Sequence, residues 1–282
     1  MLPKILVLLV PIILITSSLT LGPTLVLAAQ GNPPPGPRPQ QPHTPGLRPS
    51  QPHIRLAHPS AGQDESLNWG GYAVSAAAGS VSDVKGSWKV PSLSCSRSTS
   101  YAAFWDGIDG FSDSTVEQTG VLAECYQGYT YYYTWYEFYP SAPVYVNSQV
   151  PVKEGDVVYA EVSYASGLFT ATITDRTTGG SFSISQSDTS AMRSSAEWIA
   201  EAPSSGRQIL PLANFGTGYY GIDYTSIAST GYATVNGATG TIGSFGSAVY
   251  ELLMVTTSLT VKAQPSALTS DGESFSVAWK HS

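Results

Sequence analysis

The clearest secondary-structure signal in the chain runs from residue 156 to residue 174: Asp156-Val157-Val158-Tyr159-Ala160-Glu161-Val162-Ser163-Tyr164, then Ser166-Gly167, then Leu168-Phe169-Thr170-Ala171-Thr172-Ile173-Thr174. Both arms are rich in β-branched and aromatic residues that alternate with small or polar ones, as in a half-buried strand. The Ser-Gly pair between the arms favours a tight reversal of the chain. These residues predict a β-hairpin.

Similar strand signals recur from Asn68 onward, separated by turn formers such as Thr178-Gly179-Gly180. No window of useful length shows the periodicity of an amphipathic helix, so helices should be few and short. Many short strands in about 220 residues predict an all-β fold, a sandwich of two antiparallel sheets. The other strands predicted most clearly are Val81–Val90, Tyr101–Ile108, Val116–Cys125 and Tyr129–Tyr139.

The chain divides into three segments. Residues 1–29 contain one early lysine, an apolar run and a final Leu27-Ala28-Ala29, which predicts a secretory signal peptide that is removed. A retained membrane anchor is the alternative, because residues 5–28 are long enough to span a bilayer, but Pro11 weakens it. Residues 61–282 are expected to form the β-sandwich domain. We therefore expect a secreted, extracellular protein without stable membrane insertion.

The middle segment, residues 30–60, holds ten of the chain's twenty prolines. It offers few apolar side chains to bury, so we expect a disordered, polyproline-like tether or a removable pro-segment. It contains a short repeat, Arg38-Pro39-Gln40-Gln41-Pro42-His43 and Arg48-Pro49-Ser50-Gln51-Pro52-His53. Its three arginines face a domain that has nine basic and 20 acidic side chains from residue 61 on. This opposite charge makes docking on the domain plausible.

The acidic domain argues against nucleic acid as a partner, because phosphates require basic patches. It favours tolerance of acid, since carboxylates lose their mutual repulsion as they protonate. Cys95 and Cys125 are the only cysteines, and a disulfide between them is expected in an exported chain. A zinc site is improbable, and Asp109-Gly110-Phe111-Ser112-Asp113 indicates a polar turn more than a calcium loop. We expect no cofactor and no metal.

Histidine is nearly absent from the domain, where His281 is the single one. A Ser-His-Asp triad is therefore excluded in practice, because imidazole is its general base. The segment Asp188-Thr189-Ser190 lacks the glycine of the usual aspartic-peptidase motif. Hydrolytic chemistry in this domain must run on carboxylates, amides or hydroxyls.

Two segments carry candidate groups of that kind. In Ala196-Glu197-Trp198-Ile199-Ala200-Glu201, alternation puts Glu197 and Glu201 on one face. Shielding in a concave sheet near a second carboxylate would raise the pKa of Glu197, which suits a group that takes and gives a proton in acid. A solvated glutamate is the alternative. In Val116–Gly120, the Gln118 amide offers a donor and an acceptor, although this segment alone fits an exposed strand glutamine better.

Aromatic residues crowd into residues 129–140. One face of this strand carries Tyr131, Tyr133, Trp135, Glu137 and Tyr139, and one of the two faces is free to line a groove that stacks on sugars or peptide side chains. Two other classes of function therefore stay open. One is a glycosidase that uses Glu137 and Glu197 as its carboxylate pair. The other is a lectin-like binding module on a proline-rich stalk.

Seven motifs, in order and at compatible spacing between about residue 66 and residue 280, resemble the glutamic peptidases, also called eqolisins or peptidase family G1. The motifs are Asn68-Trp69-Gly70-Gly71-Tyr72, Gly86-Ser87-Trp88-Lys89-Val90-Pro91, Trp105-Asp106-Gly107-Ile108-Asp109-Gly110, Glu117-Gln118-Thr119-Gly120, Trp135-Tyr136-Glu137-Phe138-Tyr139-Pro140, Ala196-Glu197-Trp198-Ile199-Ala200-Glu201-Ala202-Pro203 and Asn214-Phe215-Gly216. Seven ordered matches are far more specific than any one of them.

The resemblance implies a secreted, acid-active endopeptidase with a concanavalin-like β-sandwich and a Gln/Glu dyad that directs a water molecule at peptide bonds. The dyad falls on Gln118 and Glu197. The positions that line the family's active-site cleft fall on Trp105, Asp109 and Tyr139. We add Glu137 and Glu124 as further substrate-binding candidates, and we expect a monomer that acts on polypeptide substrates.

The chain departs from the fungal pattern of the family at two positions. Fungal members carry an acid four residues after the dyad glutamine and another six residues before the tyrosine that precedes proline, where this chain has Leu122 and Tyr133. Glu124 would share the face of Leu122 and is placed to substitute in part. The chain thus resembles a non-fungal-type member, and the two departures bear on its pH optimum and subsite preferences more than on the reaction itself.

Overall fold

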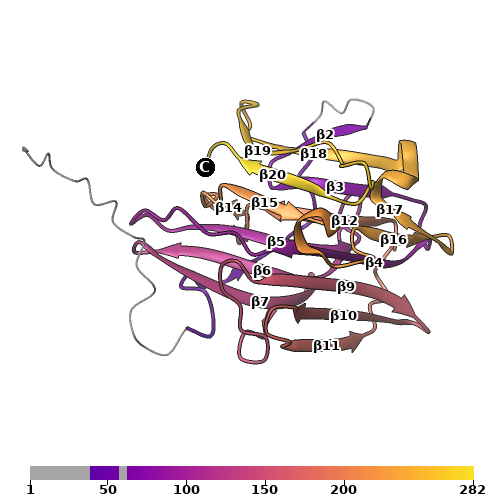
Figure 1. Ribbon diagram of the computed structural model, residues 1–282, viewed down its shortest axis with the longest axis horizontal. Helices are drawn as coiled ribbons and strands as arrows, with labels where there is room; N and C mark the ends of the chain where they lie inside the picture. The colour runs from indigo at the N-terminus through magenta and orange to yellow at the C-terminus, as the bar shows by residue number, and fades with distance from the viewer. Residues whose placement is uncertain (1–38, 57–61) are drawn as a thin grey trace, which may run out of the picture.

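The computed structural model describes residues 39–56 and 62–282, which form the predicted β-sandwich (Figure 1). Within these residues, helical structure is limited to α1 (Ile222–Thr225) and a short 3-10 segment, η1 (Ile242–Ala248). Residues 39–56 and 62–282 contain no helix with the length and apolar character needed to cross a membrane. The predicted signal peptide, residues 1–29, lies outside the described residues.

The first sheet has the strand order β2-β18-β3-β12-β5-β6-β7-β8. All neighbours in it are antiparallel except β2 and β18. Its long central strands, β5, β6 and β7, correspond to predicted strands, and β7 has the predicted bounds. The strands are β2 (Gln63–Ser66), β18 (Val249–Val255), β3 (Trp69–Ser75), β12 (Ser195–Glu201), β5 (Ser100–Ile108), β6 (Val116–Tyr126), β7 (Tyr129–Tyr139) and β8 (Val144–Tyr145).

The second sheet continues from β11 through β10 and β9 to β4, which pairs with both β15 and β16. β15 pairs with β20 and β20 with β19, while β16 forms a hairpin with β17. β19 also pairs with β18, so the two sheets are joined along one edge (Figure 1). The strands are β11 (Ser181–Gln186), β10 (Leu168–Asp175), β9 (Val157–Ala165), β4 (Val81–Lys89), β15 (Thr217–Tyr220), β16 (Tyr232–Val235), β17 (Ala238–Thr241), β19 (Val261–Pro265) and β20 (Phe275–Trp279).

The hairpin predicted over residues 156–174 is confirmed as β9 and β10. Leu168 pairs with Ala165, which leaves Ser166 and Gly167 as the two turn residues. Both have a positive φ, 52° and 83° respectively. A two-residue turn with positive φ at both positions matches the right-handed twist of the flanking strands, and glycine adopts that conformation without steric cost.

Apolar side chains gather on both faces of the first sheet. The main core fills the space between the two sheets and contains Trp88, Phe104, Phe169, Trp198 and Phe275. A second cluster covers the opposite face of the first sheet, which we call the outer face. That cluster includes Trp69, Tyr101, Trp105, Leu122, Tyr133, Trp135 and Leu47. Leu47 belongs to the proline-rich segment, so the outer face is buried in part by residues N-terminal to the domain.

Residues 39–56 therefore lie against the sandwich, and the expectation of a disordered tether needs correction for this part of residues 30–60. β1 (Leu47–Arg48) pairs with β13 (Ser204–Ser205), which pairs in turn with β14 (Gln208–Ile209). Arg48 forms an ion pair with the buried Glu137, with Nη1 2.8 Å from Oε1. The apolar content of the segment is low, and specific polar contacts replace the hydrophobic burial that the composition lacks.

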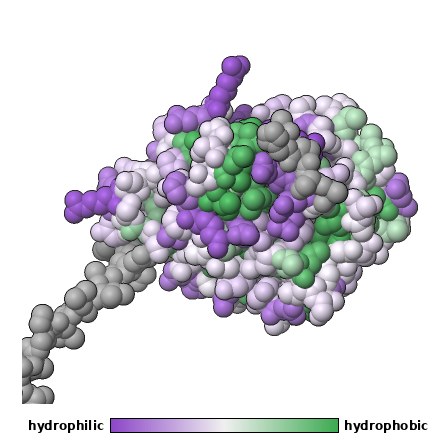
Figure 2. Space-filling model, turned by 90° about the horizontal axis from the view of Figure 1, so that it is seen from above, coloured by the Kyte–Doolittle hydropathy of each residue, from purple (hydrophilic) through white to green (hydrophobic). Residues whose placement is uncertain are grey.

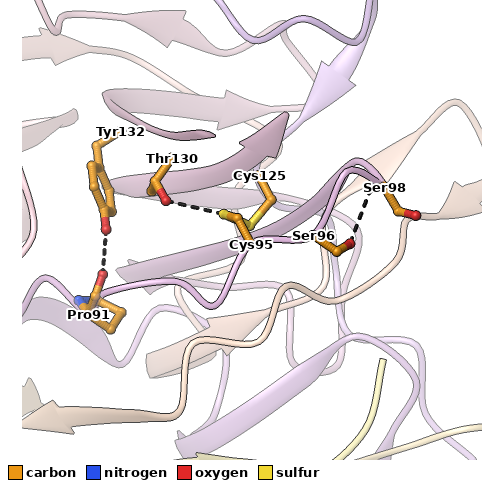
Figure 3. The surroundings of a disulfide bond; sticks show 7 residues. All are labelled: Pro91, Cys95, Ser96, Ser98, Cys125, Thr130 and Tyr132. Carbon is orange, nitrogen blue, oxygen red and sulfur yellow. Dashed lines mark hydrogen bonds between the residues drawn. A yellow bond between two sulfur atoms is a disulfide. The ribbon is translucent and has the colours of Figure 1, made fainter. Parts of the chain in front are cut away.

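The predicted disulfide is confirmed between Cys95 and Cys125, with Cα atoms 5.3 Å apart (Figure 3). It ties the segment before β5 to the end of β6, which are the strands at the centre of the first sheet. The Thr130 hydroxyl of β7 lies 3.2 Å from the Cys95 sulfur. Closing a loop of this length stabilises a fold by about 3–4 kcal/mol in the chain-entropy model.

The surface seen from above in Figure 2 is mostly polar or weakly polar, with separate apolar patches. The large apolar side chains that are exposed come from different parts of the fold: Val144, Leu168, Met192, Tyr219, Tyr224 and Leu259. Scattered exposure of this kind is ordinary for a globular domain.

Candidate active site

Cross-strand pairing in the first sheet places the two dyad candidates in one row of residues that runs across the strands, and both lie on the outer face. Gly107 of β5 pairs with Gln118 of β6 on one side and with Glu197 of β12 on the other. Residues that are directly opposite in antiparallel strands point to the same face, and adjacent strands are about 4.8 Å apart. The Cα atoms of Gln118 and Glu197 are thus about 10 Å apart, with only a glycine between them.

Gly107 is what keeps the space between the two side chains open. A Cβ atom at this position would lie 2.9 Å from the indole ring of Trp105 and 3.1 Å from the Cβ atom of Gln118. Any other residue would therefore fill the gap that the dyad candidates face. Two polar side chains that converge across such a gap from about 10 Å have room for one water molecule between them.

Glu197 is fully buried, and neither of its carboxyl oxygens has a hydrogen-bond partner within the described residues. Removal from water raises the pKa of Glu197 well above its usual value, and the carboxyl groups of Asp109, Asp113 and Glu117 add to the increase. A buried carboxyl with two unpartnered oxygens is able to bind a water molecule or a substrate group and to exchange a proton with it.

Gln118 is also fully buried and is held by Glu137 of β7, the next residue in the same row. Its Nε2 atom donates to Glu137 Oε2 at 3.1 Å, while its Oε1 atom has no partner within the described residues. Burial raises the pKa of Glu137 to about 8, although the charge of Arg48 and the two hydrogen bonds oppose this shift. The nitrogen of the Gln118 amide is therefore held by Glu137, whereas its oxygen has no partner among the described residues.

Trp105 lies on the outer face of β5, two residues before Gly107. Its Nε1 atom donates to Glu201 Oε2 at 3.0 Å, and Asn68 Nδ2 donates to Glu201 Oε1 at 3.2 Å. Burial raises the pKa of Glu201 well above its usual value. Glu201 was noted in the sequence only as the neighbour of Glu197, and its polar surroundings come from strands that are distant in sequence.

Asp109 follows the end of β5 and has a φ of 74°. Its carboxylate accepts hydrogen bonds from the backbone N–H groups of Arg193 and Ser194, both at 2.6 Å. Burial and the neighbouring Asp113 raise the pKa of Asp109 to about 6, against the effect of these bonds. Asp109 thus anchors the residues that lead into β12, close to Glu197.

The other two predicted residues lie at opposite ends of the outer face. Tyr139, at the end of β7, lies under the Arg48 guanidinium, whose Cζ atom is 5.1 Å from the ring centroid. Glu124 is six residues from Gln118 on the same strand, about 20 Å away. It accepts a 2.9 Å hydrogen bond from the Tyr133 hydroxyl and contacts His43. The structure therefore does not bring Glu124 to the dyad candidates.

Leu122 and Tyr133, the two departures from the fungal pattern, are direct cross-strand partners in β6 and β7. Both are buried in the cluster on the outer face. A pair of acids at these positions would place two carboxyl groups side by side. Their joint replacement by apolar and phenolic side chains removes the repulsion that such a pair creates.

Arg48 and Gln51 were not predicted as site residues, yet both contact this face. Two features of the sequence could have indicated this contact: the repeat that contains Arg48 and Gln51, and the opposite charges of the segment and the domain. Among the described residues there is no cluster of three or more His, Cys, Asp or Glu side chains that could hold a metal ion.

The comparisons with known proteins identify the family of the chain. Residues 67–265 match the Peptidase A4 family. Aspergillopepsin-2 of Aspergillus niger is 33% identical over 208 residues, which are 64% of this chain and 70% of that protein. The solved aspergilloglutamic peptidase of Aspergillus niger aligns with a TM-score of 0.53 and 28% identity, over 64% of this chain and 99% of that one.

The solved scytalido-glutamic peptidase, crystallised with a transition state analog inhibitor, shares the fold. It aligns with a TM-score of 0.63 and 23% identity, over 76% of this chain and 98% of that one. Since the family match extends over more than half of its length, the chain belongs to the Peptidase A4 family of glutamic peptidases and is a glutamic endopeptidase.

Proposed function

We propose that this chain is a secreted, acid-active endopeptidase in which Gln118 and Glu197 act as the catalytic dyad. The observation that carries the proposal is the row Glu197, Gly107, Gln118 across β12, β5 and β6. Two buried polar side chains face each other there over a residue without a side chain. Each has at least one polar atom without a partner among the described residues, ready for a water molecule or a substrate.

In the proposed reaction, a water molecule held between the dyad residues attacks the carbonyl carbon of the scissile peptide. Glu197, as carboxylate, takes one proton from this water as the C–O bond forms. The second N–H of the Gln118 amide, which Glu137 does not engage, donates a hydrogen bond to the carbonyl oxygen while that oxygen carries negative charge. Glu197 then gives its proton to the amide nitrogen, the C–N bond breaks, and the carboxylate is restored. No covalent intermediate with the enzyme forms.

The proposal of acid activity rests on Glu197 as the group that transfers the protons. Burial is the largest cause of the raised pKa of Glu197, so a water molecule held between the dyad residues lowers this pKa toward the usual carboxyl range. In acid, both protonation states of Glu197 are then accessible, as the two proton transfers require. Residues 61–282 contain a single histidine, His281, so the proposal gives the proton transfers to a carboxyl group.

The geometry disfavours the glycosidase alternative. Glu137 and Glu197 are three strands apart in the row, about 14 Å between Cα atoms, with Gln118 between them. Glu137 already binds the Gln118 amide and Arg48. A carboxyl that is engaged in this way is not free to act as the nucleophile or base of a carboxylate pair.

Secretion rests on residues 1–29 and on the disulfide between Cys95 and Cys125. Disulfides persist in oxidising compartments, and the apolar leader followed by small residues is typical of signal peptides. Expression of the full gene and N-terminal sequencing of the protein in the medium test this part. Retention of the whole chain in the cell fraction would contradict it.

The dyad is tested by incubating the protein with casein at pH 2–4. Glu197→Gln and Gln118→Ala should each lower kcat at least about 100-fold, the usual loss when a preorganised donor or the general base is removed. Glu154→Gln is the matched control, because Glu154 is an exposed glutamate in the loop before β9. Circular dichroism verifies folding. Near-normal turnover in either dyad variant, with the fold intact, excludes this mechanism.

A further inference from the structure

Side chains of the outer face form hydrogen bonds with the main chain of the proline-rich segment, most directly at Gln51. The backbone N–H of Gln51 donates to Glu201 Oε1 at 3.1 Å, and the backbone carbonyl of Gln51 accepts from Trp69 Nε1 at 3.0 Å. Asn68 Nδ2 is 3.4 Å from the same carbonyl oxygen and 3.3 Å from that of Pro52, and Asn68 Oδ1 accepts from the backbone N–H of Ile54 at 2.9 Å. The side-chain Nε2 atom of Gln51 is buried and has no partner within the described residues. These hydrogen bonds therefore recognise the peptide backbone of Gln51 and not its side chain.

The groups that make this contact are also hydrogen-bonded to one another or to neighbouring side chains. Glu201 accepts hydrogen bonds from Asn68 and Trp105, and Asn68 Oδ1 accepts from the Ser66 hydroxyl at 3.1 Å. The side chains of Glu201, Asn68, Trp69 and Trp105 are all fully buried. Preorganised groups of this kind hold a ligand without an ordering cost on the protein side.

The same segment also reaches the row of the dyad candidates. Arg48, three residues before Gln51, binds Glu137, which in turn binds Gln118. Glu201 lies four residues from Glu197 on the same face of β12, about 13 Å away. A chain that lies on Glu137 and Glu201 at once crosses the outer face beside both dyad strands, where the proposed reaction requires a substrate to lie.

We propose that Glu201 and Trp69 form a subsite that binds the main chain of one residue of an extended polypeptide substrate, that Asn68 binds the main chain of the residues that follow it, and that Gln51 of the chain itself fills this subsite in the structure. The proposal rests on the proposed peptidase function. The subsite takes the N–H and C=O groups of a single residue, so it accepts any side chain and discriminates only against proline or another residue without an N–H group. The N-terminal segment and the substrate compete for it.

Occupation by the chain itself is tested with two substitutions of one residue in the full-length protein. Gln51→Pro removes the N–H group that Glu201 binds, whereas Gln51→Ala keeps the main chain and removes only the side chain. Hydrogen exchange of the backbone amides in residues 39–56 is then measured by mass spectrometry. We expect exchange at least tenfold faster in Gln51→Pro and unchanged in Gln51→Ala. Equal protection in all three proteins, or equal loss in both variants, overturns the main-chain contact.

Substrate binding is tested in the Gln51→Pro protein, in which the subsite is vacant. A good peptide substrate is made in versions with one N-methylated amide at successive positions. At one position, N-methylation should raise KM about tenfold with kcat within about threefold, and the added Glu201→Gln substitution should abolish that difference. Trp69→Phe, which lacks the indole N–H, should raise KM for the unmodified peptide about tenfold. Trp88→Phe, in the core between the sheets, is the control for the loss of an indole.

The outcomes separate this proposal from the proposed function. If the Gln51 variants behave as expected but no protein cleaves any peptide at pH 2–7, the peptidase assignment fails and the segment's contact stands. If cleavage occurs and no N-methyl position is coupled to Glu201, the subsite is wrong while the peptidase stands. Where Glu201→Gln does not fold, Trp69→Phe alone decides, and an unchanged KM in that variant overturns the subsite.

Discussion

Replacement of Glu117 by glutamine should stabilise this protein at neutral pH, with a gain that grows as the pH rises. Glu117 neighbours Gln118 in sequence but points to the opposite face, into the core between the sheets. It pairs with Ile108 and Phe138, is fully buried, and neither carboxyl oxygen has a partner among the described residues. Burial, together with the charges of nearby carboxyl groups, raises the pKa of Glu117 to about 10.

The sign of the effect follows from proton linkage. The folded protein keeps the Glu117 proton up to about pH 10, whereas the unfolded chain releases it near pH 4.5. Stability from this group is fully present below pH 4.5 and is lost as the pH rises, at about 1.4 kcal/mol per pH unit. Between pH 5 and pH 7 the loss is about 3 kcal/mol, a large share of the roughly 5–15 kcal/mol that stabilises a domain.

Glutamine at position 117 carries no titrating proton, so this slope disappears. Its buried amide lacks partners and costs about 1–3 kcal/mol at every pH. The variant should therefore be less stable than the wild type near pH 4 and more stable near pH 7.

Urea unfolding followed by tryptophan fluorescence at pH 4, 5, 6 and 7 measures the free energy of unfolding for the wild type, Glu117→Gln and the exposed control Glu154→Gln. The difference between Glu117→Gln and wild type should change by about 1.4 kcal/mol per pH unit, while the control stays parallel to the wild type. Parallel lines for Glu117→Gln would show that Glu117 ionises normally in the folded protein, and the reasoning from burial would fail.

Three further predictions concern the site and its support. Gly107→Ala places a methyl group in the gap between the dyad candidates, and steady-state kinetics should show kcat lower by about 10- to 100-fold with the fold retained; an unchanged kcat would show that the gap is not used. Joint replacement of Cys95 and Cys125 by serine should lower the free energy of unfolding in urea by about 3–4 kcal/mol, and an unchanged urea midpoint would contradict that estimate. Arg48→Leu removes the cation whose charge lowers the pKa of Glu137, so a carbon-13 NMR titration should find a higher Glu137 pKa in the variant than in the wild type; an equal or lower value would contradict the ion pair.

The sequence predicts the strands well because local pattern determines them. β7 has the predicted bounds, since alternation over residues 129–139 needs no information from elsewhere in the chain. The pairing of Gln118 and Glu197 across Gly107 is different. It depends on the register of β12 against β5, although β12 is distant in sequence from β5 and β6, and periodicity does not supply that register. Resemblance to a family therefore had to assign the dyad.

The proline-rich segment shows where a prediction from amino-acid composition fails. Its composition predicts disorder because residues 39–56 offer little apolar surface, and in the described part only Leu47 joins a buried apolar cluster. The segment is held instead by an ion pair at Arg48 and by the main chain of Gln51. Main-chain contacts leave no trace in side-chain composition, and complementary charge was the single feature of the sequence that favoured docking.

The carboxyl groups of the first sheet show why a raised pKa does not by itself identify the active site. Asp106, Glu117 and Glu197 are all fully buried, all lack hydrogen-bond partners among the described residues, and all have a pKa raised chiefly by burial. Asp106 and Glu117 point into the core between two sheets, where a substrate cannot reach. Glu197 points to the outer face, which a peptide segment already covers. Access of a polypeptide, set by the alternation of side chains along a strand, is therefore what separates a catalytic carboxyl from one whose effect is the pH dependence of stability.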